Sequence, residues 1–294
     1  MEATTVDILP VTTKFTLGDS ITDEQKRFLE YYGFVHFESV ASDDEIQTIL
    51  SELDRIEAEW IGEKRRFVYG IPLFWGRDGR GQKFLQRFAF TSRFSSTISC
   101  FVSDSRFEPV RKLIGEDARV GEKEKDGVVV NRYLNVRQSA YKRLGWHTDG
   151  LRDLFYGRMP LQMLNVGLHL DRCTAEDGAL RLIPSTHNQG LRDMLCRKLY
   201  FVSHDEDPNE IIVETQAGDL TIHDGRLWHR VAPSTKAAGA TLRRTMFVPY
   251  LTGPYEPKTE SARTPAYHHL GRVNRLFQGR INSVLRLKDV LFGT

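Results

Sequence analysis

The second half of the chain, from about residue 127, consists of short apolar runs separated by turn signals, and this pattern limits the possible folds more than any other feature. The runs are GVVVNRYLNV, LQMLNVGLHL, GALRLIP, IIVETQAGDLTIH and RRTMFVPYL, and the turns between them include EDG and HDG. Strands of this length and spacing predict a β-sandwich or barrel. Helical patterns flank these runs, so we expect a mainly β fold with α-helices packed outside.

Two helix starts are marked in the first half. Thr22 is followed three residues later by Gln25, and Ser42 is followed by Glu45 at the same spacing. Each pair fits a capping box, in which two side chains satisfy backbone amides at a helix start. The second helix then carries an apolar stripe at helical spacing. The segment FVHFESV between them is typical of a short strand.

No segment has the composition of a linker or repeats another segment, so we expect a single domain over residues 1–294. Residues 1–20 are expected to form a loose leader. Residues 62–105 are aromatic, rich in arginine and glycine, and expected to be irregular. About residues 271–292, apolar residues alternate with arginine and lysine, which predicts a C-terminal helix docked on the domain. A helix lying on a membrane surface is the alternative.

Composition argues against several classes of protein. The formal net charge of +2 gives no electrostatic basis for binding nucleic acid or an anionic membrane. No apolar run approaches the length of a membrane span, and the first residues lack the pattern of a secretory signal. The three cysteines, Cys100, Cys173 and Cys196, are sparse and widely spaced. This usage is typical of reduced thiols, and we expect a cytoplasmic protein.

Three residues have the chemistry of a metal centre. In GWHTDG, His147 and Asp149 stand two residues apart, so at strand spacing both side chains point the same way. His229 in LWHRVAP could supply a third ligand. Two histidines and one carboxylate leave coordination positions open, as in non-haem iron(II) oxygenases. The alternatives are a solvated turn for the first pair and a core histidine beside Trp228 for the third residue.

The sequence around these residues resembles the phytanoyl-CoA dioxygenase family of iron(II)- and 2-oxoglutarate-dependent oxygenases. The resemblance covers roughly residues 22–250 and rests on four blocks in order: YYGFVHF, WHTDG, LHLDRCTAEDGALRLIPSTHNQG, and GDLTIHDGRLWH followed by LRRTMFVPY. It implies a double-stranded β-helix (jelly-roll, cupin-like) core. It also implies Fe(II) held by His147, Asp149 and His229, with 2-oxoglutarate and dioxygen (O2) as co-substrates.

The resemblance implies a co-substrate site as well. The distal carboxylate of 2-oxoglutarate needs a fixed cation, and the planar fork of arginine suits it. Arg243 matches the family's arginine, and Arg244, on the opposite strand face, does not. Asn135 and Asn165 match positions that face the oxo-acid, and Asn131 shares the strand face of Asn135. Surface charge is the alternative for both arginines, and backbone satisfaction is the alternative for the asparagines.

Some positions depart from the family's pattern. Ser185 gives PSTH in place of the usual PGSH, and Val231 stands where a serine often helps to hold the oxo-acid. Gly167 replaces a bulky aromatic residue and would leave room for a large substrate. His223 matches an often aromatic position, and we expect it to pack or to form a local hydrogen bond. We expect His169 to lie off the inward-facing register of Asn165.

Arginine and aromatic residues in the segment before the predicted barrel and in the loop after the HxD motif suggest a substrate pocket. Aromatic walls with a few cations suit a partly apolar molecule that carries a carboxylate or phosphate. We therefore expect a medium-sized small-molecule substrate, anionic or polar-headed. Solvated arginines and ordinary core aromatics are the alternative. The candidate substrate residues are Trp75, Arg77, Arg152, Phe155, Tyr156 and Gly167.

The sequence thus predicts an Fe(II)- and 2-oxoglutarate-dependent dioxygenase that hydroxylates an unactivated carbon of a small-molecule substrate, a specialised metabolite, with release of succinate and CO2. Asp149 argues against halogenation, which in related enzymes needs a small residue at that position. Two alternatives stay open. The same scaffold could catalyse desaturation, epimerisation or ring formation, or it could be a non-catalytic jelly-roll binding protein, which the complete triad disfavours.

Overall fold

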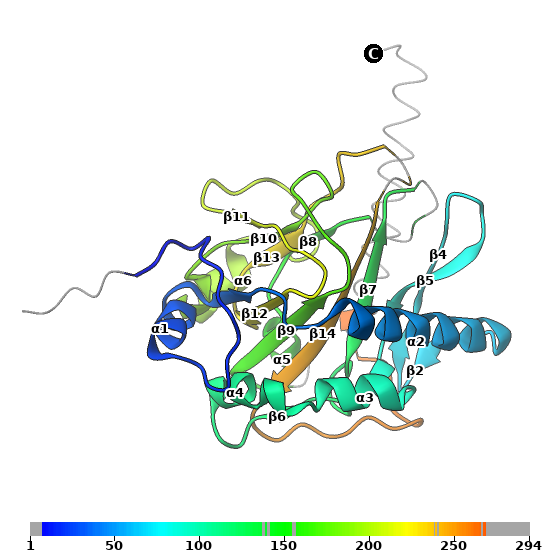
Figure 1. Ribbon diagram of the computed structural model, residues 1–294, viewed down its shortest axis with the longest axis horizontal. Helices are drawn as coiled ribbons and strands as arrows, with labels where there is room; N and C mark the ends of the chain where they lie inside the picture. The colour runs from blue at the N-terminus through cyan, green and yellow to red at the C-terminus, as the bar shows by residue number, and fades with distance from the viewer. Residues whose placement is uncertain are drawn as a thin grey trace, which may run out of the picture.

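The computed structural model describes residues 8–136, 139, 142–154, 157–237, 239, 241–265 and 267–268, and these form two main antiparallel β-sheets with flanking helices (Figure 1). The large sheet has the order β1-β12-β9-β14-β7-β5-β4, and β6 pairs with β14. The small sheet has the order β11-β10-β13-β8. The predicted C-terminal helix over residues 271–292 lies outside the described residues.

The strands of the large sheet are β1 (Phe34–Phe37), β4 (Phe74–Arg77), β5 (Lys83–Phe88), β6 (Arg119–Val120), β7 (Val129–Leu134), β9 (Met163–His169), β12 (Leu220–Asp224) and β14 (Leu242–Leu251). Those of the small sheet are β8 (Leu144–His147), β10 (Leu180–Leu182), β11 (Ile211–Val213) and β13 (His229–Val231). β2 (Phe67–Val68) and β3 (Ile71–Pro72) form a separate hairpin.

The helices are α1 (Asp23–Tyr32), α2 (Asp43–Gly62), α3 (Ser96–Val102), α4 (Glu108–Arg111), α5 (Leu151–Leu154) and α6 (Leu191–Cys196), with 3-10 turns η1 (Thr91–Arg93), η2 (Ser105–Phe107), η3 (Lys112–Ile114) and η4 (Thr186–Asn188). Both predicted capping boxes are confirmed, at Thr22 with Gln25 and at Ser42 with Glu45. The apolar stripe of α2 lies in the main core against the large sheet. Among the described residues, no helix is both long enough and apolar enough to cross a membrane.

The large sheet has two chemically different faces. On β9, Leu164, Val166 and Leu168 belong to the core beneath the helices. The alternate residues Asn165 and Gly167 face the other way, because successive strand side chains point to opposite faces. Across that inner face, Phe34 of β1 packs with Leu182 and Val213 of the small sheet. The two sheets therefore face one another, and polar residues of the inner face lie between them.

The predicted mainly β fold with a jelly-roll core and flanking helices is confirmed, as two open sheets within the described residues. Each of the five apolar runs contains a strand, and the fourth contains both β11 and β12. Residues 62–105 are more regular than expected, because they contribute two hairpins and α3. The described part of residues 1–20 contacts the fold more closely than a loose leader would, since Phe15 forms backbone hydrogen bonds with His36 and Glu38.

Candidate metal centre

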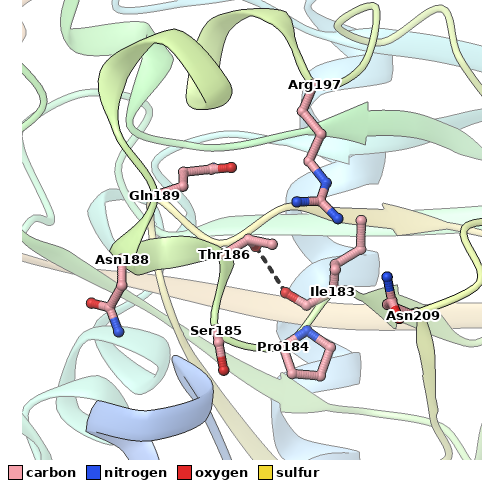
Figure 2. Close-up of a pocket in the computed structure, with 8 residues that line it drawn as sticks. All are labelled: Ile183, Pro184, Ser185, Thr186, Asn188, Gln189, Arg197 and Asn209. Atoms are coloured by element: carbon pink, nitrogen blue, oxygen red, sulfur yellow. Dashed lines mark hydrogen bonds between the residues drawn. The ribbon is translucent and has the colours of Figure 1, made fainter.

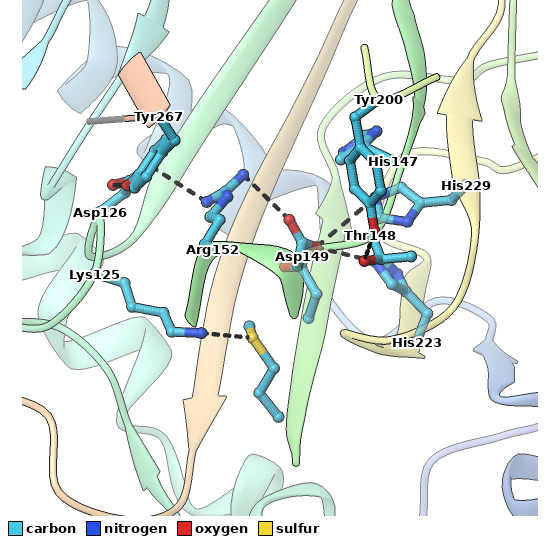
Figure 3. Close-up of polar contacts among 12 residues, drawn as sticks. Lys125, Asp126, His147, Thr148, Asp149, Arg152, Tyr200, His223, His229 and Tyr267 are labelled. Atoms are coloured by element: carbon cyan, nitrogen blue, oxygen red, sulfur yellow. Dashed lines mark hydrogen bonds and ion pairs between the residues drawn. The ribbon is translucent and has the colours of Figure 1, made fainter. Parts of the chain in front are cut away.

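His147 and His229 are cross-strand neighbours at the ends of β8 and β13. Their ring centroids are 4.1 Å apart. Asp149 follows β8 in a turn that is held by a backbone hydrogen bond of 2.7 Å from Gly150 N to Gly225 O. One ligand atom from each of the three side chains lies within 4.8 Å of the others, and all three are buried. The structure therefore brings the sequence-predicted triad together between the two sheets (Figure 3).

The two imidazoles are oriented by their own strands. His147 Nδ1 lies 2.9 Å from Gly145 O, and His229 Nδ1 lies 3.0 Å from Leu227 O. A proton on each Nδ1 satisfies that carbonyl and leaves the lone pair of Nε2 for a metal ion. Burial lowers the pKa of His147 to about 4 and holds the pKa of His229 well below its ordinary value. Both rings are thus neutral at physiological pH, as metal ligands must be.

Asp149 is ionised and held at both oxygens. Its Oδ1 lies 3.1 Å from Arg152 Nη2, and its Oδ2 accepts a hydrogen bond of 2.8 Å from Asn165 Nδ2. Burial by itself would raise the pKa of Asp149, but Arg152 and the surrounding histidines hold it well below its ordinary value. Neutral imidazoles and a charged carboxylate form a donor set that fits iron(II). Asn165 was expected to face the co-substrate, and in the structure it contacts the triad carboxylate Asp149.

His223 lies in this centre and was underestimated by sequence reasoning. It is 1% exposed, its ring centroid is 4.5 Å from that of His229, and its Nε2 is 3.6 Å from Asp149 Oδ2. Neither ring nitrogen has a hydrogen-bond partner among the described residues, so of the two expectations for His223 the structure shows packing against His229. The signal that could have found it is strand alternation, because Thr221 and His223 share the inner face of β12. His169 also shares the face of Asn165, four residues away, and its Nε2 lies 3.0 Å from Thr221 Oγ1, which corrects the expected register.

The two adjacent arginines have opposite surroundings. Arg243 is buried, 6% exposed, on the inner face of β14, where its guanidinium lies 5.1 Å from the ring centroid of Tyr133. It donates to the carbonyl oxygens of Gly178 and Lys142, and its Nε has no partner. No carboxylate of the described residues lies within salt-bridge distance of it. Arg244, on the outer face, forms a two-pronged pair with Asp171 at 2.8 and 2.6 Å.

The other two asparagines differ in their roles. Asn131 lies beside Thr245 and Arg87 in the strand register, on the face of Arg243. Asn135 donates a hydrogen bond of 3.1 Å to Lys236 O, in the segment that leads toward β14. The structure therefore places Asn131 on the inner face and gives Asn135 a backbone partner.

The candidate substrate residues are not gathered at one site. Trp75 lies on edge strand β4, donates to Arg65 O at 3.1 Å and is covered by Lys83. Arg77 is exposed in the same hairpin and donates to Gly81 O at 2.7 Å. A Cβ on Gly167 would lie 3.0 Å from the ring of Phe247 and 3.1 Å from Thr221 Oγ1, so that glycine leaves less room than expected. Phe155 and Tyr156 lie outside the described residues, and Arg152 contacts Asp149.

A separate hollow of about 550 Å³ lies at the turn after β10 (Figure 2). Its lining combines that turn with residues of η4, α6 and the loop before β11, namely Ile183, Pro184, Ser185, Thr186, Asn188, Gln189, Arg197 and Asn209. None of these residues belongs to the triad or its contacts. The chemistry is therefore assigned to the triad by its donor set and geometry, and not to this hollow.

Comparison with known proteins agrees with this geometry. A sequence model of the phytanoyl-CoA dioxygenase family matches residues 29–239. The chain is 24% identical over 234 residues to a protein of Stutzerimonas stutzeri named a probable alpha-ketoglutarate-dependent hypophosphite dioxygenase; the match covers 76% of this chain and 75% of that protein.

Solved structures resemble the fold. The epimerase SnoN, in complex with Fe3+, alpha ketoglutarate and nogalamycin RO, has a TM-score of 0.57 and 17% identity, over 79% of this chain and 85% of its own. EvdO2 from Micromonospora carbonacea var. aurantiaca, complexed with 2-oxoglutarate, has a TM-score of 0.55 and 18% identity, over 83% of this chain and 96% of its own. At such identities the likeness concerns the fold.

Proposed function

This chain belongs to the phytanoyl-CoA dioxygenase family of iron(II)- and 2-oxoglutarate-dependent oxygenases, and we propose that it hydroxylates an unactivated carbon of a small-molecule substrate. The observation that supports this reaction most strongly is the buried triad of His147, Asp149 and His229. Oxidation of such a C–H bond needs an oxidant that side chains cannot provide, and iron(II) with 2-oxoglutarate and dioxygen would supply it. We further propose that residues 1–294 form one oxygenase domain.

In this proposal, the triad holds the metal ion and Arg243 holds the co-substrate. A buried guanidinium without a carboxylate partner is costly, because taking a charge out of water is compensated only by pairing. The distal carboxylate of 2-oxoglutarate would provide that pair in the planar two-bond geometry that arginine favours. The Tyr133 ring beside Arg243 limits access of water to the same position. The overall balance consumes one dioxygen and one 2-oxoglutarate and gives succinate, carbon dioxide and the hydroxylated product.

We propose a substrate with a polar or anionic head. The support is His223, whose ring nitrogens lie in the centre without a hydrogen-bond partner among the described residues and could bind an oxygen atom of a substrate or co-substrate. The relative named for hypophosphite, a small oxyanion, is compatible with such chemistry. Arg152 no longer supports this proposal, since its partners are acidic side chains of the chain itself.

The test combines co-substrate turnover with product mass. Purified protein with Fe(II), 2-oxoglutarate and dioxygen is expected to form succinate, and omission of iron or oxygen should stop it. In a metabolite screen, hydroxylation adds the mass of one oxygen atom, desaturation removes two hydrogens, and epimerisation leaves the mass unchanged, as would be expected of an enzyme like SnoN. Succinate formation without any added oxygen in the product would replace hydroxylation by one of the alternatives. Absence of iron-dependent succinate formation under all conditions would favour the binding-protein alternative.

A further inference from the structure

A line of charged side chains runs away from the metal centre into the protein (Figure 3). Arg152 Nη2 lies 3.1 Å from Asp149 Oδ1, and Arg152 Nη1 lies 3.3 Å from Asp126 Oδ2. Asp126 Oδ2 is also 2.6 Å from Arg87 Nη2. The four side chains thus alternate in sign, from the triad carboxylate to β5. None of these contacts follows from the metal chemistry described above.

Asp126 is the point at which several elements converge. It precedes β7, is 3% exposed, and contacts Arg87 of β5 and Arg152 of α5 through one oxygen. Its other oxygen accepts a hydrogen bond of 2.8 Å from the hydroxyl of Tyr267. Burial by itself would raise the pKa of Asp126, but Arg87, His268 and Arg152 hold it well below its ordinary value. A fully buried carboxylate is therefore kept charged by partners from separate parts of the chain.

The two oxygens of Asp149 have different partners. Oδ2 lies on the histidine side, 3.8 Å from His229 Nε2, and Oδ1 faces Arg152. A carboxylate with a separate contact on each oxygen cannot rotate freely about its Cβ–Cγ bond. The planar fork of Arg152 reaches two carboxylates at once, which the single ammonium group of a lysine does not reproduce. Partners of metal ligands that act in this way are known to tune metal affinity.

We propose that Arg152 is a positioning residue for the metal ligand Asp149, and that Asp126 anchors Arg152 in turn. This inference rests on the proposed function, because it presumes that Asp149 binds the metal. It reassigns Arg152 from the substrate pocket to the support of the triad. Asp126 has a second role in this arrangement, since its negative charge, which it shares between Arg87 and Arg152, reduces the repulsion that these cations would exert on a divalent cation.

Metal affinity measured without turnover tests the proposal. Metal-free wild type and the variants R152K and R152Q are titrated with Mn(II) in a calorimeter, and their folding is checked by thermal unfolding. R152K keeps the charge and loses the fork, and we expect Mn(II) affinity about tenfold weaker. R152Q loses both the charge and the fork, and its affinity for Mn(II) should be no higher than that of R152K. R158Q, in the same loop, is the matched control, because Arg158 donates to the carbonyl oxygen of Pro254 and should leave affinity unchanged.

The outcomes separate this inference from the proposed function. If wild type itself binds no Mn(II), the proposed function fails. If wild type binds and R152K binds equally well, or R152Q binds more tightly, the positioning role is overturned and Arg152 acts only through its charge or not at all. If R152Q does not fold, the Mn(II) affinity of R152K by itself tests the positioning role. The variant D126N provides a second readout. D126N and R152K should each lower the affinity for Mn(II). Because both substitutions break one contact, the double variant should lose less binding free energy than the sum of the two single losses. Additive losses would contradict the anchoring role of Asp126.

Discussion

At the scale of single residues, Arg243 and Arg244 are adjacent but should differ sharply in function. R243K removes the planar fork from a buried site where no carboxylate of the described residues lies within salt-bridge distance, and we expect the 2-oxoglutarate concentration needed for half-maximal succinate formation to rise about tenfold to a hundredfold. R244K is the matched control, since Arg244 pairs with Asp171 on the outer face of the sheet. Steady-state kinetics of both variants measures the difference. A larger effect of R244K would mean that the outer-face arginine serves the co-substrate.

His223 gives a second residue-scale prediction. Its two buried ring nitrogens have no hydrogen-bond partner among the described residues, and an unsatisfied buried polar group costs about 1–3 kcal/mol. H223F replaces the imidazole by an apolar ring, so the metal-free variant should unfold at a denaturant concentration no lower than that of wild type. In the Mn(II)-loaded protein the same variant should bind 2-oxoglutarate or substrate more weakly, because the polar atoms are then missing from the site. A marked loss of stability in metal-free H223F would show that the imidazole is structural.

At the scale of elements, the close contact between β8 and residues 199–203 should be indispensable. Trp146 N donates to Ser203 O and Phe201 N donates to Trp146 O, both at 2.9 Å, and the Phe201 ring lies 4.9 Å from that of His147. A Cβ on Gly145 would lie 2.6 Å from Phe201 O. G145A should therefore cost about 1–3 kcal/mol of unfolding free energy and weaken Mn(II) binding.

The matched control for that substitution is G62A. Gly62 ends α2, and a Cβ there meets no atom within 4 Å. Alanine is also the better helix former, so the control should be neutral or up to about 1 kcal/mol more stable. Urea unfolding of both variants provides the comparison. Equal stability of G145A and G62A would contradict the close approach at β8.

The elements also show what a sequence can predict. The capping boxes of α1 and α2 were predictable because each depends on four neighbouring residues. The triad was predictable because HxD at strand spacing and a later histidine stand within sequence blocks that resemble one family, whereas HxD alone is a weak signal. The pairing of β1 with β12 and the central place of β14 were not, because strand order depends on contacts between residues far apart in the chain.

The same limit explains the residues that sequence reasoning missed or misplaced. Asp126 stands in EKEKDG, a charged stretch that reads as a solvated turn, and only the fold brings Arg87, Arg152 and Tyr267 to it. Gly167 was expected to open space, but Phe247 from β14 fills that space. In each case the deciding partner comes from a distant segment.

At the scale of the whole molecule, the stability of the metal-free protein should fall as the pH is lowered from about 6.5 to about 4. Burial lowers the pKa of His147 to about 4 and that of His169 to about 3, from an ordinary value of 6.5. Across this range the unfolded chain takes up protons that the folded chain does not, so unfolding becomes more favourable. Asp126 and Asp149 add to the loss only below their ordinary value of 3.8. Urea unfolding at several pH values measures the slope, and a flat profile from pH 6.5 to 4 would contradict the neutral buried state of these imidazoles.

The measurement that tests the central claim most directly is a calorimetric titration of the metal-free chain with Mn(II), followed by 2-oxoglutarate. The claim is that a metal ion and the oxo-acid meet at His147, Asp149 and His229. Wild type should bind Mn(II), and 2-oxoglutarate should bind with measurable heat only after the metal is present. H229A should remain folded and should bind neither Mn(II) nor 2-oxoglutarate. Binding of Mn(II) and 2-oxoglutarate by H229A with the affinity of wild type would contradict the account.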